Sequence, residues 1–327
     1  MKRTLFFICT LLCANVILAQ EWLATLKHND TISVFYGQNA FVNAHNAAAD
    51  GDTITLSDGE FNSCTITKNI TLRGNGAIQD TTRNCNGTYF RNTIRLDGVS
   101  SFNAEGINFS VINTYDSPTI NLRKCIVTSM YRIRNQDSRC INNAYLVNCI
   151  VTNMFSRNPE GLTFINSVIR CTYYYNGWSY DELPNATAIN CIMIGYGDST
   201  LDKHYYNCIL VNPDGGNPKI GMGLNNNILC GFNGLYGIFN EYNEFMSVSE
   251  VFDSWNGSTI SSNPETYRLI PNFSSPIYNY DANDVGIFGG EFPFDFTPSY
   301  SVIRDINIGT RTNENEELEV EIELLTE

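Results

Sequence analysis

The 327-residue sequence predicts an all-β solenoid, in which short parallel strands are stacked in successive coils. Three observations predict this fold: a short motif recurs, the segments before it alternate between apolar and polar residues, and an Asn usually opens it. The steps between successive motifs are 24, 18, 24, 17 and 19 residues, and a period near about 20 is typical of a solenoid with one unit per repeat. The motif occurs at Lys124–Val127, Asn148–Val151, Asn166–Ile169, Asn190–Met193, Asn207–Leu210 and Asn226–Leu229.

Each repeat unit is predicted to consist of short strands. Segments such as 162–165 and 186–189 alternate between apolar and polar residues, which is typical of a strand with one buried face. An Asn between two such strands tolerates left-handed backbone and so turns the chain sharply. Stacked coils would place these Asn residues in a ladder whose side-chain amides bond one another. The predicted ladder consists of Asn148, Asn166, Asn190 and Asn207.

A column of cysteines is predicted at the first inward position after these turns, where Cys behaves as a small hydrophobic residue. Parallel coils keep neighbouring Cβ atoms about 4.8 Å apart, whereas a disulfide needs about 3.8 Å. We therefore expect free buried thiols, with a metal or redox column as the alternative, and we expect Cys149→Ser to be more harmful than Cys149→Ala. The column consists of Cys125, Cys149, Cys191 and Cys208. The sequence leaves open the pairing of Cys64, Cys85, Cys140, Cys171 and Cys230.

The chain resembles the right-handed parallel β-helix proteins, the pectin-lyase-like fold of pectate lyases and polygalacturonases, and in particular their bacterial secreted type. Residues 40–49 and 51–56 are similar to the family's entry, where a short amphipathic helix caps the first coil. Residues 267–290 resemble the closing segment of such proteins, and the similar stretches are 267–271, 275–277 and 284–290. The resemblance covers about residues 30 to 290. It implies the fold rather than an activity, because enzymes and binding proteins share this fold.

The N-terminus is predicted to be a signal peptide over residues 1–19. Lys2 and Arg3 precede an apolar run, and small Ala19 stands before the expected cleavage point. The run is shorter than the roughly 20 residues that span a bilayer, so we expect removal rather than a retained anchor. The mature protein would then be secreted, periplasmic or held at the cell surface, without stable membrane insertion. Residues 20–290 would form the β-helix with its caps, in which His45 is a cap residue rather than a ligand.

The remaining segment, 291–327, is predicted to be an acidic tail that contains a strand. Leu318, Val320, Ile322 and Leu324 alternate with glutamates, which indicates one apolar face. We expect this strand to pack on the flank of the solenoid, with an interaction tail as the alternative. The chain has 34 acidic and 20 basic residues, for a net charge of -14, and this balance disfavours nucleic acid as a partner.

An aromatic segment, residues 173–182, is the strongest candidate for ligand binding. Tyr and Trp combine an apolar body with a polar tip, so their density here favours stacking against sugar rings. The next coil's loop would lie on the same flank and add polar groups. The alternative is that the tyrosines only pack on the solenoid. The predicted binding residues are Tyr173, Tyr174, Tyr175, Trp178, Tyr180, Asp181, Asp202 and His204.

Two further clusters of charged residues are weaker candidates. A Ca²⁺ ion would need several oxygen ligands, and no other cofactor is predicted. Its candidate ligands are Asp181, Glu182, Asp198 and Asp202. A second cluster, Arg132, Arg134 and Arg139, could receive acidic sugars or pair with Asp137.

Catalytic signatures of the β-helix enzymes are not legible in the sequence. The motifs of polygalacturonase-like hydrolases and of calcium-dependent lyases are absent, so no catalytic residue and no established metal ligand is assigned. We therefore expect an exported, non-catalytic protein that binds glycan or acts as a surface adhesin. The alternatives are a polysaccharide lyase or glycoside hydrolase, which would need two groups converging across adjacent coils, and a purely structural role.

Overall fold

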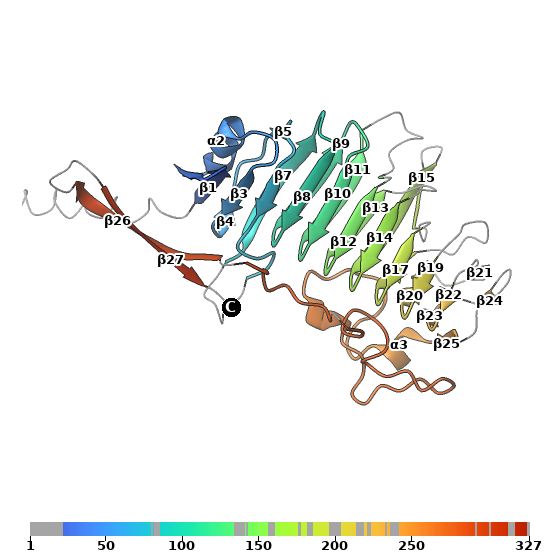
Figure 1. The fold of residues 1–327 in the computed structure, drawn as a ribbon. Helices are drawn as coiled ribbons and strands as arrows, with labels where there is room; N and C mark the ends of the chain where they lie inside the picture. The colour runs from blue at the N-terminus through green and yellow to red at the C-terminus, as the bar shows by residue number, and fades with distance from the viewer. Residues whose placement is uncertain are drawn as a thin grey trace, which may run out of the picture.

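The protein folds as a parallel β-helix, which confirms the predicted all-β solenoid (Figure 1). Two long sheets run along the molecule, and each coil contributes one strand to each sheet. The computed structural model describes residues 22–79, 81, 86–133, 141, 143–155, 161–175, 178–181, 186–195, 204–213, 219–220, 224–232, 234–235, 242–291, 293–300, 302–312 and 318–325. The predicted signal peptide lies outside these residues. Within them, no helix is long and apolar enough to cross a bilayer.

Sheet A has eleven strands, and all of its pairings from β3 onward are parallel. In spatial order the strands are β2 (Thr31–Tyr36), β1 (Leu23–His28), β3 (Thr53–Leu56), β6 (Thr71–Arg73), β8 (Ser101–Glu105), β10 (Thr119–Arg123), β12 (Ala144–Val147), β14 (Leu162–Ile165), β17 (Thr187–Ile189), β19 (His204–Tyr206) and β22 (Leu224–Asn225).

Sheet B faces sheet A and has twelve strands. In spatial order they are β25 (Glu244–Met246), β23 (Ile228–Cys230), β20 (Ile209–Val211), β18 (Ile192–Ile194), β15 (Val168–Tyr175), β13 (Ile150–Phe155), β11 (Ile126–Arg132), β9 (Asn108–Thr114), β7 (Thr88–Leu96) and β4 (Gly59–Glu60), with β16 (Trp178–Asp181) on β15 and β5 (Thr65–Ile66) on β7. A separate parallel pair is formed by β21 (Lys219–Ile220) and β24 (Gly234–Leu235).

The N-terminal end differs from the prediction that parallel coils begin near residue 30. Strands β1 and β2 form an antiparallel hairpin, and β1 also pairs antiparallel with β3. Helix α2 (Ala40–Ala47) follows, and its Phe41 and His45 are buried in the end of the core. The Lys68 ammonium donates to the carbonyls of His45, Asn46 and Ala48 at the C-terminal end of the helix.

One residue per coil makes the turn from sheet A to sheet B, and we call this row of residues the turn edge. Each has left-handed backbone, with φ between 44° and 56°. The predicted bonding of the Asn amides to one another is wrong. Asn166 Nδ2 instead donates to the carbonyls of Ile287 and Gly289 at 3.0 and 2.9 Å, because a C-terminal segment brings these backbone carbonyls to the turn edge. The turn edge consists of Lys124, Asn148, Asn166, Asn190, Asn207 and Asn226.

The residue after each turn-edge residue points into the solenoid and forms a buried column. Its cysteines are free, and the column consists of Cys125, Cys149, Ser167, Cys191, Cys208 and Asn227. The expectation of an apolar environment is wrong, because the N–H groups of Cys149, Cys191 and Cys208 leave the strand ladder at the turn and donate to the column side chain of the next coil. The Cys149 Sγ donates to the Val147 carbonyl at 3.3 Å, and the Cys149 N–H donates to Ser167 Oγ at 3.0 Å. Ser167 Oγ in turn donates to the Ile165 carbonyl at 2.8 Å.

The outer face of sheet B carries a second apolar row, which is also buried. The row consists of Ile126, Ile150, Val168, Ile192, Ile209 and Ile228. A C-terminal segment covers it with a second hydrophobic core, in which Trp255 and Tyr267 pack edge to face at 5.1 Å. This segment includes helix α3 (Val248–Val251) and the short 3-10 helix η2 (Pro264–Tyr267). Among the described residues, no such segment covers sheet A over its exposed Tyr145, Ile189 and Tyr206.

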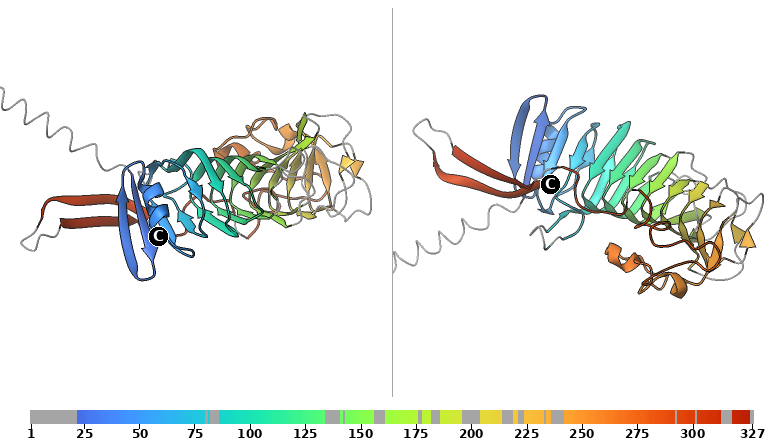
Figure 2. Two further views of the ribbon diagram at one scale, coloured as in Figure 1. Left: turned by 90° about the horizontal axis from the view of Figure 1, so that it is seen from above. Right: turned by 60° about the horizontal axis from the view of Figure 1, so that its bottom comes forward.

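Residues 280–291 and 293–300 form what we call the strap, which runs back along the turn edge toward the N-terminal end (Figures 1 and 2). At one end the Tyr280 hydroxyl donates to Asn226 Oδ1 at 3.2 Å. At the other end the Tyr300 hydroxyl donates to the carbonyls of Gly74 and Glu105 at 2.7 and 3.0 Å. The predicted boundary at residue 290 therefore falls inside a segment that stays on the solenoid to residue 300.

Strands β26 (Val302–Thr312) and β27 (Leu318–Leu325) form an antiparallel hairpin. Among the described strands they pair only with each other. Figures 1 and 2 show this hairpin extending away from the solenoid, past its N-terminal end. The expectation that this strand packs on the solenoid flank is therefore wrong. The chain leaves the flank after Tyr300, and residues 318–325 pair with β26 instead.

Candidate ligand site

The predicted aromatic segment forms the end of β15 and all of β16. These strands pair antiparallel, with Tyr175 opposite Trp178, Tyr174 opposite Ser179, and Tyr173 opposite Tyr180. The segment is thus a β-hairpin that prolongs sheet B at the side away from the turn edge, rather than an irregular loop. The side chains of residues 172–181 lie outside the description, so their predicted role as a sugar platform stays a prediction.

The polar residues assigned to the next coil are only partly described. His204 opens β19, is exposed, and pairs with Thr187 of β17 on sheet A. Asp202, like Asp198 and Glu182, lies outside the described residues. Among the residues that the structure does describe, no group of three or more His, Cys, Asp or Glu is placed to hold a metal ion. The proposed Ca²⁺ ligands are not covered by that finding, and the Ca²⁺ site stays a prediction.

The arginine cluster and the cysteine column can be assessed in part. Arg132 ends β11, and its Nε donates to the Tyr115 carbonyl at 3.3 Å. Arg134, Asp137 and Arg139 lie outside the described residues.

In the cysteine column, burial raises the pKa of Cys149 to about 12, against weaker opposing hydrogen bonds from the backbone. Because metal binding and redox chemistry need the thiolate, this shift disfavours the alternative of a metal or redox column.

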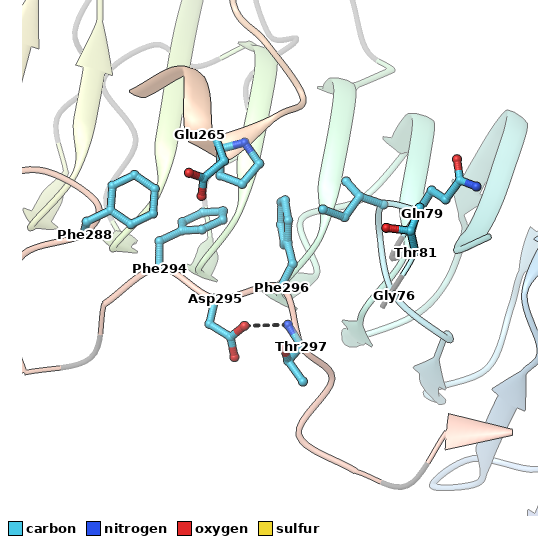
Figure 3. Close-up of a pocket in the computed structure, with 11 residues that line it drawn as sticks. Gly76, Gln79, Thr81, Glu265, Phe288, Phe294, Asp295, Phe296 and Thr297 are labelled. Carbon is cyan, nitrogen blue, oxygen red and sulfur yellow. Dashed lines mark hydrogen bonds between the residues drawn. The ribbon is translucent and has the colours of Figure 1, made fainter. Parts of the chain in front are cut away.

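One cleft lies between the strap and the segment after β6, and has a volume of about 310 Å³. Figure 3 shows Phe288, Phe294 and Phe296 on one side, with Gln79 and Thr81 across from them. Its charged groups are already paired: Glu265 binds Arg268, and Asp295 Oδ1 accepts from the Thr297 N–H at 2.8 Å. The rings of Phe294 and Phe296 also belong to the second core. This cleft therefore offers few free groups to a ligand.

A larger cleft, of about 590 Å³, lies on the other side of the strap, and we call it the strap cleft. Its floor is the outer face of sheet A, its wall is the turn edge, and the strap closes the opposite side. The lining residues are Glu105, Arg123, Lys124, Tyr145, Val147, Asn148, Ile165, Glu291, Pro293, Asp295 and Ser299. Both its size and its mixture of apolar surface with a few polar groups are typical of small-molecule sites.

The strap is fixed beside this cleft by charged contacts. Lys124 Nζ lies 3.1 Å from Asp295 Oδ2 and also donates to the Thr297 carbonyl. Partial burial raises the pKa of Asp295, but the Thr297 hydrogen bonds and the Lys124 ammonium outweigh it and hold the pKa below its ordinary value. Glu105 Oε1 accepts from the Ser299 N–H at 2.9 Å. The strap is therefore anchored beside the cleft at Asp295, Thr297 and Ser299.

Sequence reasoning missed the strap cleft and the cover on sheet B. The cover had a readable signal, because the position after each Cys of the repeat is almost always Ile, which leaves an outward apolar row to be buried. The cleft had none, because it joins residues 105–165 to residues 291–299. Comparison of the chain with protein-family models, curated proteins and solved structures finds no match.

Proposed function

We propose that this chain is an exported, non-catalytic glycan-binding protein of the right-handed, pectin-lyase-like type found among bacterial secreted proteins. The observation that carries the proposal is the β15–β16 hairpin. It holds five aromatic residues on two paired strands, which is a more rigid support than an open loop. Tyr and Trp on such a support supply large contact faces at low entropy cost. The basic and apolar N-terminal run supports export, and surface adhesion is one use of such binding.

The uncovered face of sheet A gives this proposal a second support. The parallel register aligns the outward residues of successive coils in rows. One row contains Asn103, Asn121, Tyr145 and Thr163, and the amide of Asn121 donates to Asn103 Oδ1 at 2.8 Å. Rows of hydroxyl, amide and aromatic groups along an elongated molecule suit an elongated polymer with many hydroxyls.

The test is a glycan array with the mature chain, followed by affinity measurements on the best ligand for Trp178→Ala. We expect this variant to weaken binding by more than about 1 kcal/mol, as loss of a rigid contact face does, with an unchanged melting temperature. Tyr36→Ala is the matched control, because Tyr36 is an exposed aromatic residue of β2, the N-terminal edge strand of sheet A, and does not belong to the hairpin on sheet B.

Assays for reducing ends and unsaturated products on the same ligands separate binding from catalysis. Turnover of a bound polysaccharide would replace the proposal by a lyase or hydrolase. A large loss of melting temperature in Trp178→Ala, with no change in affinity, would show that the aromatic residues only pack on the solenoid.

A further inference from the structure

We propose that the strap cleft is a second sugar-binding site, which takes one or two neutral pyranose units. The proposal starts from Asn148, which lines the cleft, is 7% exposed, and makes no side-chain hydrogen bond with any residue that the structure describes. Its Oδ1 is a buried oxygen without a partner. Buried polar groups are normally paired, so an orphaned amide in the wall of a cleft marks a place where a ligand would be bound.

The neighbouring coils show what an amide at this position binds. Asn166 Nδ2 donates to two strap carbonyls, and Asn190 Nδ2 donates to the Asp284 carbonyl at 2.9 Å. Asn148 occupies the same turn with the same backbone, but the strap stands away from it and the cleft opens there. A hydroxyl of a bound molecule can therefore accept from Asn148 Nδ2, as the strap carbonyls do from the amides of the next two coils, and a hydroxyl can also donate to the unpaired Oδ1.

The rest of the lining favours a sugar ring. Tyr145 is 40% exposed, and with Val147 and Ile165 it gives an apolar floor for the CH face of a pyranose. Arg123 and Glu291 are exposed, and their side chains make no hydrogen bond or ion pair in the described part of the chain. They supply donors and an acceptor for ring hydroxyls, which both donate and accept.

The charge of the cleft favours a neutral sugar over a uronate. Its two cations are Arg123 and Lys124, and its three carboxylates are those of Glu105, Glu291 and Asp295. Lys124 is already paired with Asp295, so Arg123 is the one free cation among the described lining residues. The carboxylates of Glu105 and Glu291 line the same cleft, so a further carboxylate on the ligand would be repelled more than attracted.

The experiment measures binding of cellotetraose, xylotetraose, mannotetraose and tetragalacturonate to the mature full-length chain by isothermal titration calorimetry. We expect at least one neutral tetrasaccharide to bind, and both Tyr145→Ala and Asn148→Gly to weaken it by about tenfold or more. Glycine keeps the left-handed turn at residue 148, so Asn148→Gly removes the amide without straining the backbone. Urea unfolding of each variant checks that the fold is kept.

Two variants control for position. Tyr206→Ala removes a tyrosine of similar exposure from the same face of sheet A but outside the cleft, and should leave affinity unchanged. Asn166→Gly removes an amide that binds the strap, and should lower stability more than Asn148→Gly does.

Four outcomes would overturn the proposal. In the first two, none of the neutral tetrasaccharides binds, or tetragalacturonate binds more tightly than they do. In the other two, Tyr145→Ala and Tyr206→Ala lose the same amount of affinity, or both Tyr145→Ala and Asn148→Gly keep full affinity. If affinity is kept in the cleft variants but lost in Trp178→Ala, the strap cleft fails as a site while the proposed function stands. The reverse pattern would support the cleft and reject the aromatic hairpin.

Discussion

Replacing Cys149 tests whether the buried column is apolar or hydrogen-bonded. An apolar column would tolerate Cys149→Ala better than Cys149→Ser, since a hydroxyl would lack a partner. The structure predicts the opposite order, because Ser167 occupies the equivalent position one coil later and is fully buried with both a donor and an acceptor. Cys149 itself donates to the carbonyls of Val147 and Leu122, at 3.3 and 3.5 Å.

The expected loss in the free energy of unfolding follows from the groups that each substitution leaves unpaired and from the volume that it leaves empty. Alanine removes the sulfur to which the Cys125 N–H donates, which leaves that backbone N–H unpaired in the core and costs about 1–3 kcal/mol. The missing sulfur also leaves a small cavity, which costs about a further 0.5 kcal/mol. Serine keeps the hydrogen bonds and loses only some packing volume, so it should cost no more than about 1 kcal/mol. We expect Cys149→Ala to be the less stable variant by about 1–2 kcal/mol.

The assay is urea unfolding under reducing conditions, followed by tryptophan fluorescence, with midpoints compared at equal slope. The reciprocal pair Ser167→Ala and Ser167→Cys provides an internal control, and alanine should again be the worse substitution. If serine at position 149 lowers the midpoint more than alanine does, the hydrogen-bonded column is refuted and the apolar interpretation is restored.

Three further predictions concern the strap, the buried His45 and the thiols. Gly290→Ala should loosen the strap and speed its proteolysis, because φ is 81° there and a Cβ would lie 2.6 Å from Asn190 Oδ1; an unchanged cleavage rate would contradict this contact. Burial, aided by the Lys68 charge, lowers the pKa of His45, so the unfolded chain binds the proton more readily and stability should fall as pH drops below about 6.5. His45→Gln should remove that dependence between pH 7 and 5 in thermal melts, and an identical slope in both proteins would exclude His45 as its source. Denatured but unreduced protein should react with a thiol reagent at four or more cysteines, because the four column thiols are free in the structure; a single reactive thiol would show disulfides between coils.

The repeating part of the fold could be predicted from the sequence because each coil carries the same local information. Asn148 and Asn190 mark the left-handed turns, and the residues on either side alternate as strands must. The partners of the turn amides could not be predicted in this way. They depend on carbonyls of residues 284–289, more than 90 positions later, whose approach no local pattern encodes.

The two candidate sites differ in the same way: one is contiguous in sequence, and the other is assembled from distant segments. The aromatic hairpin is contiguous in sequence, so the density of Tyr and Trp is enough to single it out. The strap cleft joins Tyr145 and Asn148 to residues 291–299, and its lining is unremarkable within each segment. The polar character of the column did have a local signal in Ser167, because a Ser at a position otherwise held by Cys indicates a site that accepts a polar group.

The strap also imposes an order on folding. A ribosome delivers the chain from its N-terminus, so the coils can stack one by one as they emerge. Their outward isoleucine row nevertheless stays bare until residues 246–296 have been made, and Tyr300 meets Gly74 across 226 positions of sequence. A truncated or stalled chain would thus expose a continuous apolar row along the length of its sheet B. Such a chain is prone to aggregate until the C-terminal segment has been made and covers the row.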